Sequence, residues 1–267
     1  MVKRIVSAVV GIPAFLFFVY LGGVYFAGLI IALSLLASVE LSRMLKRMGM
    51  KEMQSFLYTG ALLFPVLFYF EPAWLPSFMV LFILSGVIIS LSHYPEHSFT
   101  DMSANFFSLY YVAFGFAHLL LLRQMEQGML LVIYAFAVIW MNDIGAYCVG
   151  TYIGKHPFFD YISPNKTVEG ALAGIVAGVV GGLLFCVMIN RVMTLDNMGF
   201  LIFLTPFLCV AGQAGDLFES TLKRKARTKD SSQLIPGHGG ILDRFDSALW
   251  VAPLLYHILQ IRINIFS

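Results

Sequence analysis

Long apolar segments alternate with short polar breaks along the whole chain. A helix that crosses a membrane needs about 20 predominantly apolar residues, and many of the apolar segments approach that length. The pattern predicts an all-α integral membrane protein with about nine transmembrane helices, over residues 5–21, 24–39, 55–70, 77–91, 104–122, 129–153, 170–189, 199–215 and 245–263.

Composition supports this fold class. The chain is 59% hydrophobic and 12% charged, whereas soluble domains carry about 25% charged residues. Its three cysteines lie in apolar segments without CxxC spacing, so neither a disulfide scaffold nor a zinc site is predicted.

The basic residues predict the orientation. If the N-terminus is cytoplasmic, nine spans leave only Arg123, Arg191 and Arg262 in outer segments, out of 17 Lys and Arg in the chain. Since cytoplasmic segments are enriched in Lys and Arg, we expect a multi-pass protein of the cell (inner) membrane with a cytoplasmic N-terminus. We divide it into N-terminal membrane helices (1–103, spans 1–4) and a C-terminal catalytic domain (104–267, spans 5–9).

The first polar break, residues 40–54, combines basic and apolar residues at helical spacing. This spacing indicates a short amphipathic helix at the membrane surface. Its cations suit anchoring to anionic lipid headgroups and, as the weaker alternative, phosphate binding; they are Arg43, Lys46, Arg47 and Lys51.

The most informative stretch is 216–246. A dense run of Lys and Arg, from Lys223 to Lys229, precedes a glycine-rich turn around His238 and the closely spaced Asp243 and Asp246. An ordinary cytoplasmic loop would explain the cations, but not the aspartates and glycines. The combination favours phosphate held jointly by Lys or Arg and a divalent metal.

Helical spacing groups some of these residues. Asp216, Ser220 and Lys223 fall on one face of an extended eighth helix. Asp243 and Asp246 are three residues apart at the start of the ninth, so both can point the same way, although Asp243 alone could be an N-cap. Oxygen ligands without a nearby Cys or His set favour Mg²⁺.

Two features lie outside this stretch. Asp143 falls inside the sixth span near its inner end, where a carboxylate is costly unless it faces a cavity and has a partner. The seventh span has a glycine every fourth residue, which allows close packing within the chain or in a homodimer; these are Gly170, Gly174, Gly178 and Gly182.

The order of residues resembles the phosphatidate cytidylyltransferases (CDP-diacylglycerol synthases). The resemblance covers roughly residues 139 to 250 and rests on a few motifs: Asn142-Asp143-x-x-Ala146-Tyr147, Ser163-Pro164-x-Lys166-Thr167-x-Glu169-Gly170, Gly215-Asp216-Leu-Phe-Glu219-Ser220 and Pro236-x-His238-Gly-Gly-x-x-Asp243-Arg244-x-Asp246.

The resemblance implies that CTP and phosphatidate react to CDP-diacylglycerol and pyrophosphate with Mg²⁺, at a bilayer site facing the cytoplasm near the inner face, without nucleic acid. Within the signature 220–246 and its surroundings, the implied catalytic residues are Asp216, Lys223, Arg224, Asp243, Arg244 and Asp246. Implied phosphate-binding residues are Lys166, Ser220, Lys223, Arg224, Lys229, His238, Gly239 and Gly240. Implied metal ligands are Asp216, Asp243, Asp246 and, more weakly, Asp143.

Two alternatives remain open at this point. A CTP-dependent polyprenol or lipid kinase has similar metal and nucleotide needs, but it would release CDP. A transporter of an anionic substrate would share the many spans, although transporters often show internal repeats and none is evident here.

Overall fold

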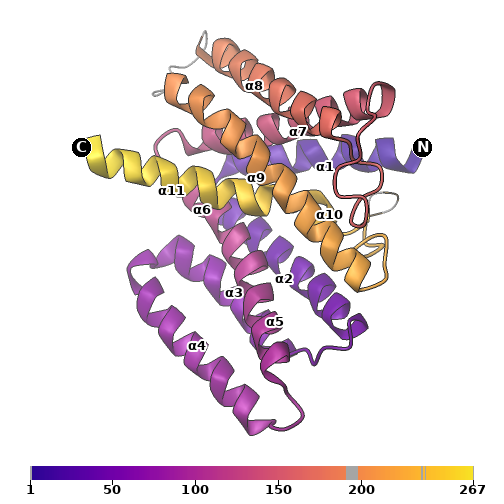
Figure 1. The fold of residues 1–267 in the computed structure, drawn as a ribbon. Coiled ribbons are helices and arrows are strands. Elements are labelled where there is room, and N and C mark those ends of the chain that lie inside the picture. The colour runs from indigo at the N-terminus through magenta and orange to yellow at the C-terminus, as the bar shows by residue number, and fades with distance from the viewer. Residues whose placement is uncertain (1, 191–197, 236, 238, 267) are drawn as a thin grey trace. The chain divides into compact units, whose positions relative to one another are not determined.

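The computed structural model describes residues 2–190, 198–235, 237 and 239–266. Over these residues every regular element is a helix, and two pairs of residues form isolated bridges outside the helices (Figure 1). The chain divides into two compact units: residues 1–121 with 222–245, and residues 122–221 with 246–267. The predicted division after residue 103 and the predicted catalytic role of 104–267 stay predictions.

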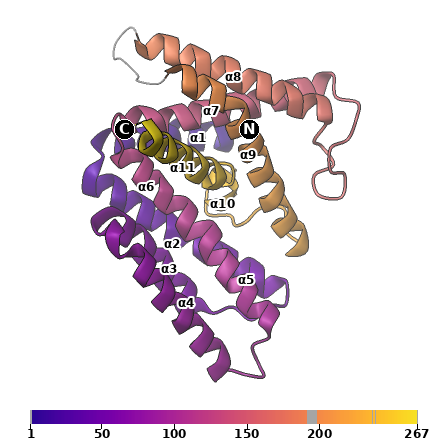
Figure 2. The same cartoon turned by 60° about the vertical axis from the view of Figure 1, so that its left-hand side comes forward.

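The first unit contains most of the N-terminal helices and one short later helix. Its elements are α1 (Val2–Leu21), α2 (Gly23–Arg47), α3 (Gln54–Phe70), the 3₁₀ turn η1 (Pro72–Trp74), α4 (Leu75–Ser92), α5 (Phe99–Leu109), the π-helical turn η2 (Tyr110–Phe114), most of α6 (Gly115–Gln124) and α10 (Leu242–Phe245). Figure 2 shows α3, α4 and α5 lying along one another. Phenylalanines fill the space between them, with Phe56 stacked on Phe82 at 4.6 Å between ring centroids.

The second unit is built from α7 (Gly128–Tyr152), α8 (Val168–Asn190), most of α9 (Met198–Lys225) and α11 (Ala248–Phe266). The predicted glycine face packs α8 onto α7: a Cβ at Gly174 would lie 2.9 Å from the Asn142 carbonyl oxygen. A Cβ at Gly178 would overlap the Cys209 sulfur. Intramolecular packing thus accounts for this stripe, because small residues let helix backbones approach closely.

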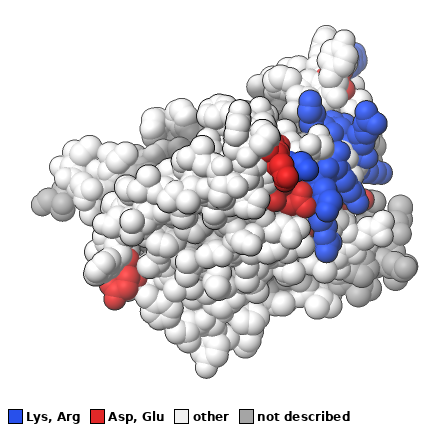
Figure 3. Space-filling model, turned by 90° about the horizontal axis from the view of Figure 1, so that it is seen from below, with Lys and Arg blue, Asp and Glu red and all other residues white. Residues whose placement is uncertain are grey.

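Seven helical segments are long and apolar enough to cross a membrane, by length and composition, among the residues the structure describes. They span Gly23–Arg47, Pro72–Ser92, Phe99–Gln124, Gly128–Tyr152, Val168–Ile189, Met198–Lys225 and Ala248–Ile265. Val9–Leu21 and Gln54–Phe70 are shorter apolar helices. Most of the face in Figure 3 carries neither basic nor acidic side chains, as expected for a multi-pass membrane protein. The count of nine and the orientation stay predictions.

Two predicted elements were wrong in detail. The surface helix over 40–54 is not separate, since α2 runs without a break to Arg47 and only then turns at Gly49, whose φ is 79°. Nothing between Val39 and Arg47 interrupts a helix, because Gly and Pro are absent there. The ninth helix is also divided, into α10 and α11. Asp243 and Asp246 therefore do not share a helix.

Candidate active site

Asp243 connects three parts of the charged stretch within the first unit. Its Oδ1 accepts a hydrogen bond from Lys223 Nζ at 2.8 Å, from the end of α9. Its Oδ2 accepts from Ser231 N at 2.8 Å, Ser231 Oγ at 2.7 Å and Gly240 N at 2.8 Å. The carboxylate thus fixes the helix end, the serine segment and the glycine-rich turn relative to one another.

Burial by itself raises the pKa of Asp243, whose side chain is 5% exposed. The hydrogen bond from Gly240 N and the ammonium of Lys223 outweigh that effect, and the pKa lies below its ordinary value. Asp243 is therefore a carboxylate at neutral pH, and its negative charge holds Lys223 in place.

Glu40 was not predicted as a site residue, yet it fixes the same segment from α2. Its carboxylate accepts hydrogen bonds from Ser231 Oγ at 2.9 Å, Ser232 Oγ at 2.6 Å, Ile241 N at 2.9 Å and Leu242 N at 2.9 Å. The residue is 2% exposed. The sequence feature that could have indicated this role is an acidic residue directly after an apolar segment. In the sequence analysis Glu40 was counted as part of the polar break 40–54.

Ser231 lies between the two carboxylates. Its hydroxyl oxygen is within hydrogen-bond distance of both Glu40 and Asp243. A serine hydroxyl carries one hydrogen, so it donates to only one carboxylate at a time. The two buried acids thus share a donor, and the position of Ser231 depends on both.

The glycine-rich turn requires its glycines for backbone geometry. Gly237 and Gly239 have φ of 81° and 80°, values that L-residues with a side chain rarely adopt. Ile235 N donates to Gly239 O at 2.8 Å, which closes the turn. A Cβ at Gly240 would overlap the Glu40 carboxylate and the Ser231 hydroxyl. The predicted phosphate ligand His238 lies outside the described residues.

A second ion pair joins two predicted site residues in the second unit. Lys166 Nζ lies 2.7 Å from Asp216 Oδ2. Lys166 comes from the loop before α8 and Asp216 from α9, with side chains 28% and 37% exposed. The loop is fixed at its end by Glu169, which accepts from the backbone N–H groups of Lys155 and His156.

Polar side chains also join the helices of this unit. Gln213 Nε2 on α9 donates to Asn142 Oδ1 on α7 and to Ala171 O on α8, at 2.9 Å each. Asn142 Nδ2 donates to the neighbouring Asp143 Oδ1 at 3.2 Å. Asp143 is exposed on α7, and Asp246 Oδ1 accepts from Ser247 N at 2.6 Å. The polar residues of motif 142–147 thus begin a network through the middle of the unit.

The predicted acids suit Mg²⁺ in kind, because this ion prefers oxygen ligands and keeps several waters. No three Asp, Glu, His or Cys side chains gather into a metal cluster in the described part of the chain. Asp243 meets four donors and Asp216 is paired with Lys166. These acids would hold a metal only together with oxygens from elsewhere, such as substrate phosphates, and the metal assignment stays a prediction.

The all-helical fold with several apolar segments long enough to cross a membrane defines a multi-pass membrane protein, and two acid–lysine pairs lie within its charged segments. The family model described as "Cytidylyltransferase family" matches residues 2–262. The chain belongs to this family.

Several curated relatives are similar over most or much of the chain. The phosphatidate cytidylyltransferase of Bacillus subtilis (strain 168) is 36% identical over 267 residues, covering 98% of both chains. That of Staphylococcus saprophyticus is 40% identical over 182 residues, covering 67% of this chain and 68% of the relative. That of Staphylococcus haemolyticus is 40% identical over 180 residues, covering 66% of each.

Proposed function

We propose that this protein transfers the cytidylyl group of CTP to phosphatidate, giving CDP-diacylglycerol and pyrophosphate for phospholipid synthesis. The observation that carries the proposal is the part-buried Lys223–Asp243 pair within the signature 220–246. It is supported by relatives named phosphatidate cytidylyltransferase that match almost the whole chain.

The proposed reaction requires no covalent bond between the protein and a substrate. A phosphate oxygen of phosphatidate attacks the α-phosphorus of CTP, one P–O bond forms, and the bond to the β-phosphate breaks with release of pyrophosphate. The attacking oxygen is already anionic near neutral pH, so no general base is required. Catalysis then depends on positioning the two substrates and on neutralising the negative charges of their phosphate groups.

Each unit, taken by itself, has a lysine that is suited to contact phosphate. Lys223 is oriented by Asp243, and Lys166 by Asp216, each at an N–O distance below 3 Å. An ammonium has three donors, so Lys166 does not exhaust its capacity on Asp216. We assign Arg224, Lys229 and Arg244 to further phosphate contacts, as the resemblance implies.

We further propose that Mg²⁺ enters with the CTP phosphates. We assign Asp216, whose side chain is 37% exposed, and Asp246 as its ligands, with Asp143 as a weaker one. Asp243 would join only by giving up some of its four donors. The bound ion would neutralise phosphate charge. We place the site at the cytoplasmic face of the cell membrane, where CTP is available.

Product analysis tests the reaction. Purified protein in detergent is given phosphatidate, Mg²⁺ and CTP labelled at either the α- or the γ-phosphate. A cytidylyltransferase puts the α-label into lipid and the γ-label into pyrophosphate. Transfer of the γ-label to a lipid alcohol with release of CDP would instead identify a kinase, and absence of any CTP-dependent product would refute the proposal.

A further inference from the structure

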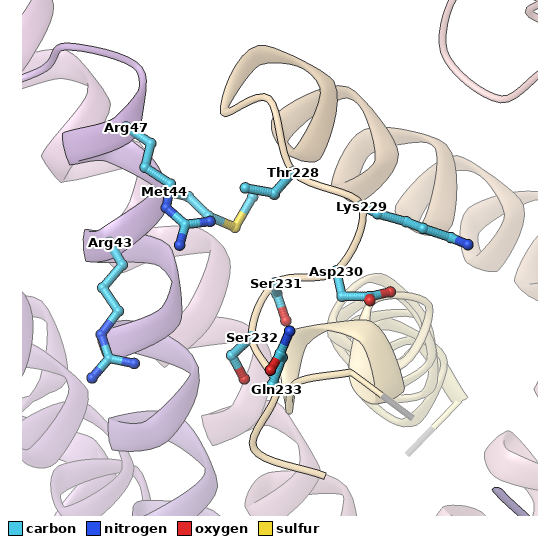
Figure 4. Close-up of a pocket in the computed structure, with 9 residues that line it drawn as sticks. All are labelled: Arg43, Met44, Arg47, Thr228, Lys229, Asp230, Ser231, Ser232 and Gln233. Carbon is cyan, nitrogen blue, oxygen red and sulfur yellow. The ribbon is translucent and has the colours of Figure 1, made fainter. Parts of the chain in front are cut away.

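A pocket of about 340 Å³ lies in the first unit between the end of α2 and the segment 228–233. Figure 4 shows Arg43, Met44 and Arg47 on α2, across the pocket from the segment that runs from Thr228 to Gln233. The volume is at the lower end of the range of about 300–1,000 Å³ for small-molecule sites. The pocket is therefore large enough to admit a phosphate group.

The pocket lining is positively charged. Arg43 and Arg47 are exposed and one helical turn apart, so they lie on the same side of α2. Within the described residues neither arginine has an ion-pair or hydrogen-bond partner, whereas Lys46 on the same turn is paired with Glu52 at 3.4 Å. A third basic residue, Lys229, also lines the pocket, and Asp230 contributes a carboxylate to the lining.

In Figure 4 the side chain of Lys229 extends away from α2. The two arginines are therefore the cations assigned to the pocket. A guanidinium binds phosphate oxygens through two parallel N–H groups, so each of the two arginines offers the pocket a phosphate-binding group.

One wall of the pocket is continuous with the candidate active site. Ser231 lines the pocket and also donates to Asp243, and Glu40, one turn before Met44 on α2, holds Ser231 and Ser232. A ligand here would lie against the segment that positions the Lys223–Asp243 pair. Cations that served only to attract the bilayer surface would need no such neighbour.

We propose that Arg43 and Arg47 form a phosphate subsite that binds a phosphate group of one of the two substrates. This inference rests on the proposed function and deepens it. It replaces the role of membrane-surface anchor that the sequence favoured for these arginines. The phosphate comes from either CTP or phosphatidate, whose phosphate groups share the same chemistry, and the experiment separates the two.

The test uses Arg43→Gln, Arg47→Gln and the double variant of the full chain, in neutral detergent with phosphatidate as the sole anionic lipid. Lys46→Gln is the matched control, because it removes one charge from the same turn and does not line the pocket. The Michaelis constants for CTP and for phosphatidate are measured separately. Arg47→Lys tests whether charge alone suffices.

We expect the KM for one substrate to rise about tenfold or more in the double variant, which is equivalent to about 1.4 kcal/mol. The KM for the other substrate should change less than about threefold. A rise for CTP identifies a nucleotide phosphate, and a rise for phosphatidate the lipid phosphate. The Lys46→Gln variant should keep both values. Unchanged KM values in the double variant, or an equal rise in Lys46→Gln, would overturn the proposal.

A second readout is independent of turnover. The rise in Tm that CTP or phosphatidate gives the wild-type protein should shrink in the double variant and persist in Lys46→Gln. If the wild type makes no CDP-diacylglycerol, the proposed function fails, and this comparison still decides the subsite. A ligand-induced rise in Tm that is equal in the wild type and the double variant would refute it.

Discussion

The hydroxyl oxygen of Ser231 lies within hydrogen-bond distance of the Glu40 carboxylate, at 2.9 Å and across 191 positions of sequence. This contact joins the end of α2 to the charged stretch that carries the family signature. Both side chains are buried, so the bond is shielded from competing water. The N-terminal helices are thus part of the machinery that holds the signature segment in shape.

Removal of the Glu40 charge should loosen this segment. We expect Glu40→Ala to lower kcat by more than tenfold and to lower the free energy of unfolding by about 1–3 kcal/mol, because buried donors lose their acceptor. Activity assays and thermal melts of the purified protein measure both effects. Glu96→Gln, an exposed acid in a loop, is the control. Unchanged melting and turnover in Glu40→Ala would show that the four bonds are dispensable.

Gly240→Ala should be more damaging than an ordinary glycine replacement. The added methyl group would overlap the Glu40 carboxylate and the Ser231 hydroxyl, so the turn must shift and Gly240 N would leave Asp243. We expect loss of most activity. Gly199→Ala, whose Cβ position meets no atom within 4 Å, should keep it. Similar activity in the two variants would contradict the close packing seen at Gly240.

The aspartates can be compared under limiting Mg²⁺. We expect Asp216→Asn, Asp243→Asn and Asp246→Asn to remain in the membrane and to lose turnover by about 100-fold or more. Added Mg²⁺ should partly restore Asp216→Asn and Asp246→Asn but not Asp243→Asn, because Asp243 primarily holds Lys223. Asp160→Asn, in an exposed loop position, is the control. Near-normal activity of all three at low Mg²⁺ would refute the metal assignment.

The glycine face of α8 should control stability before chemistry. Gly178→Leu places a large side chain where a Cβ already overlaps the Cys209 sulfur, and overpacking costs about 1–3 kcal/mol. We expect a lower Tm in detergent, whereas Gly28→Leu, at an open position on α2, should melt normally. A normal Tm with lost activity would place this face in the path of a substrate instead.

Asp243 should also give the protein a defined acid sensitivity. Its folded pKa lies below its ordinary value, so its ionised form stabilises the fold at every pH above the unfolded value of about 3.9. This contribution is lost as pH falls below about 3.9 and through the folded pKa. Melting temperatures between pH 7 and pH 3 should therefore fall less steeply in Asp243→Asn. Parallel curves would show that Asp243 contributes nothing to acid stability.

Much of the fold could be predicted because its signals are local. Apolar length predicts helices such as α7 and α8, and a glycine at every fourth position predicts a close helix contact, now found at Gly174 and Gly178. The order of residues in the stretch 216–246 was enough to indicate the family, since the motif's spacing is a property of the chain alone.

Tertiary structure decided which polar groups meet. Nothing in the sequence pairs Glu40 with Ser231, because residues 191 positions apart come together only through packing of the helices between them. The break between α10 and α11, which separates Asp243 from Asp246, could not be predicted from the hydrophobic periodicity either. Apolar residues continue at helical spacing across the break. The lengths of the apolar segments and the order of the motif residues can thus be read from the sequence alone. The hydrogen-bond partners of the buried charges are decided only by the tertiary structure, because a buried charge is stable only when hydrogen-bond or ion-pair partners surround it.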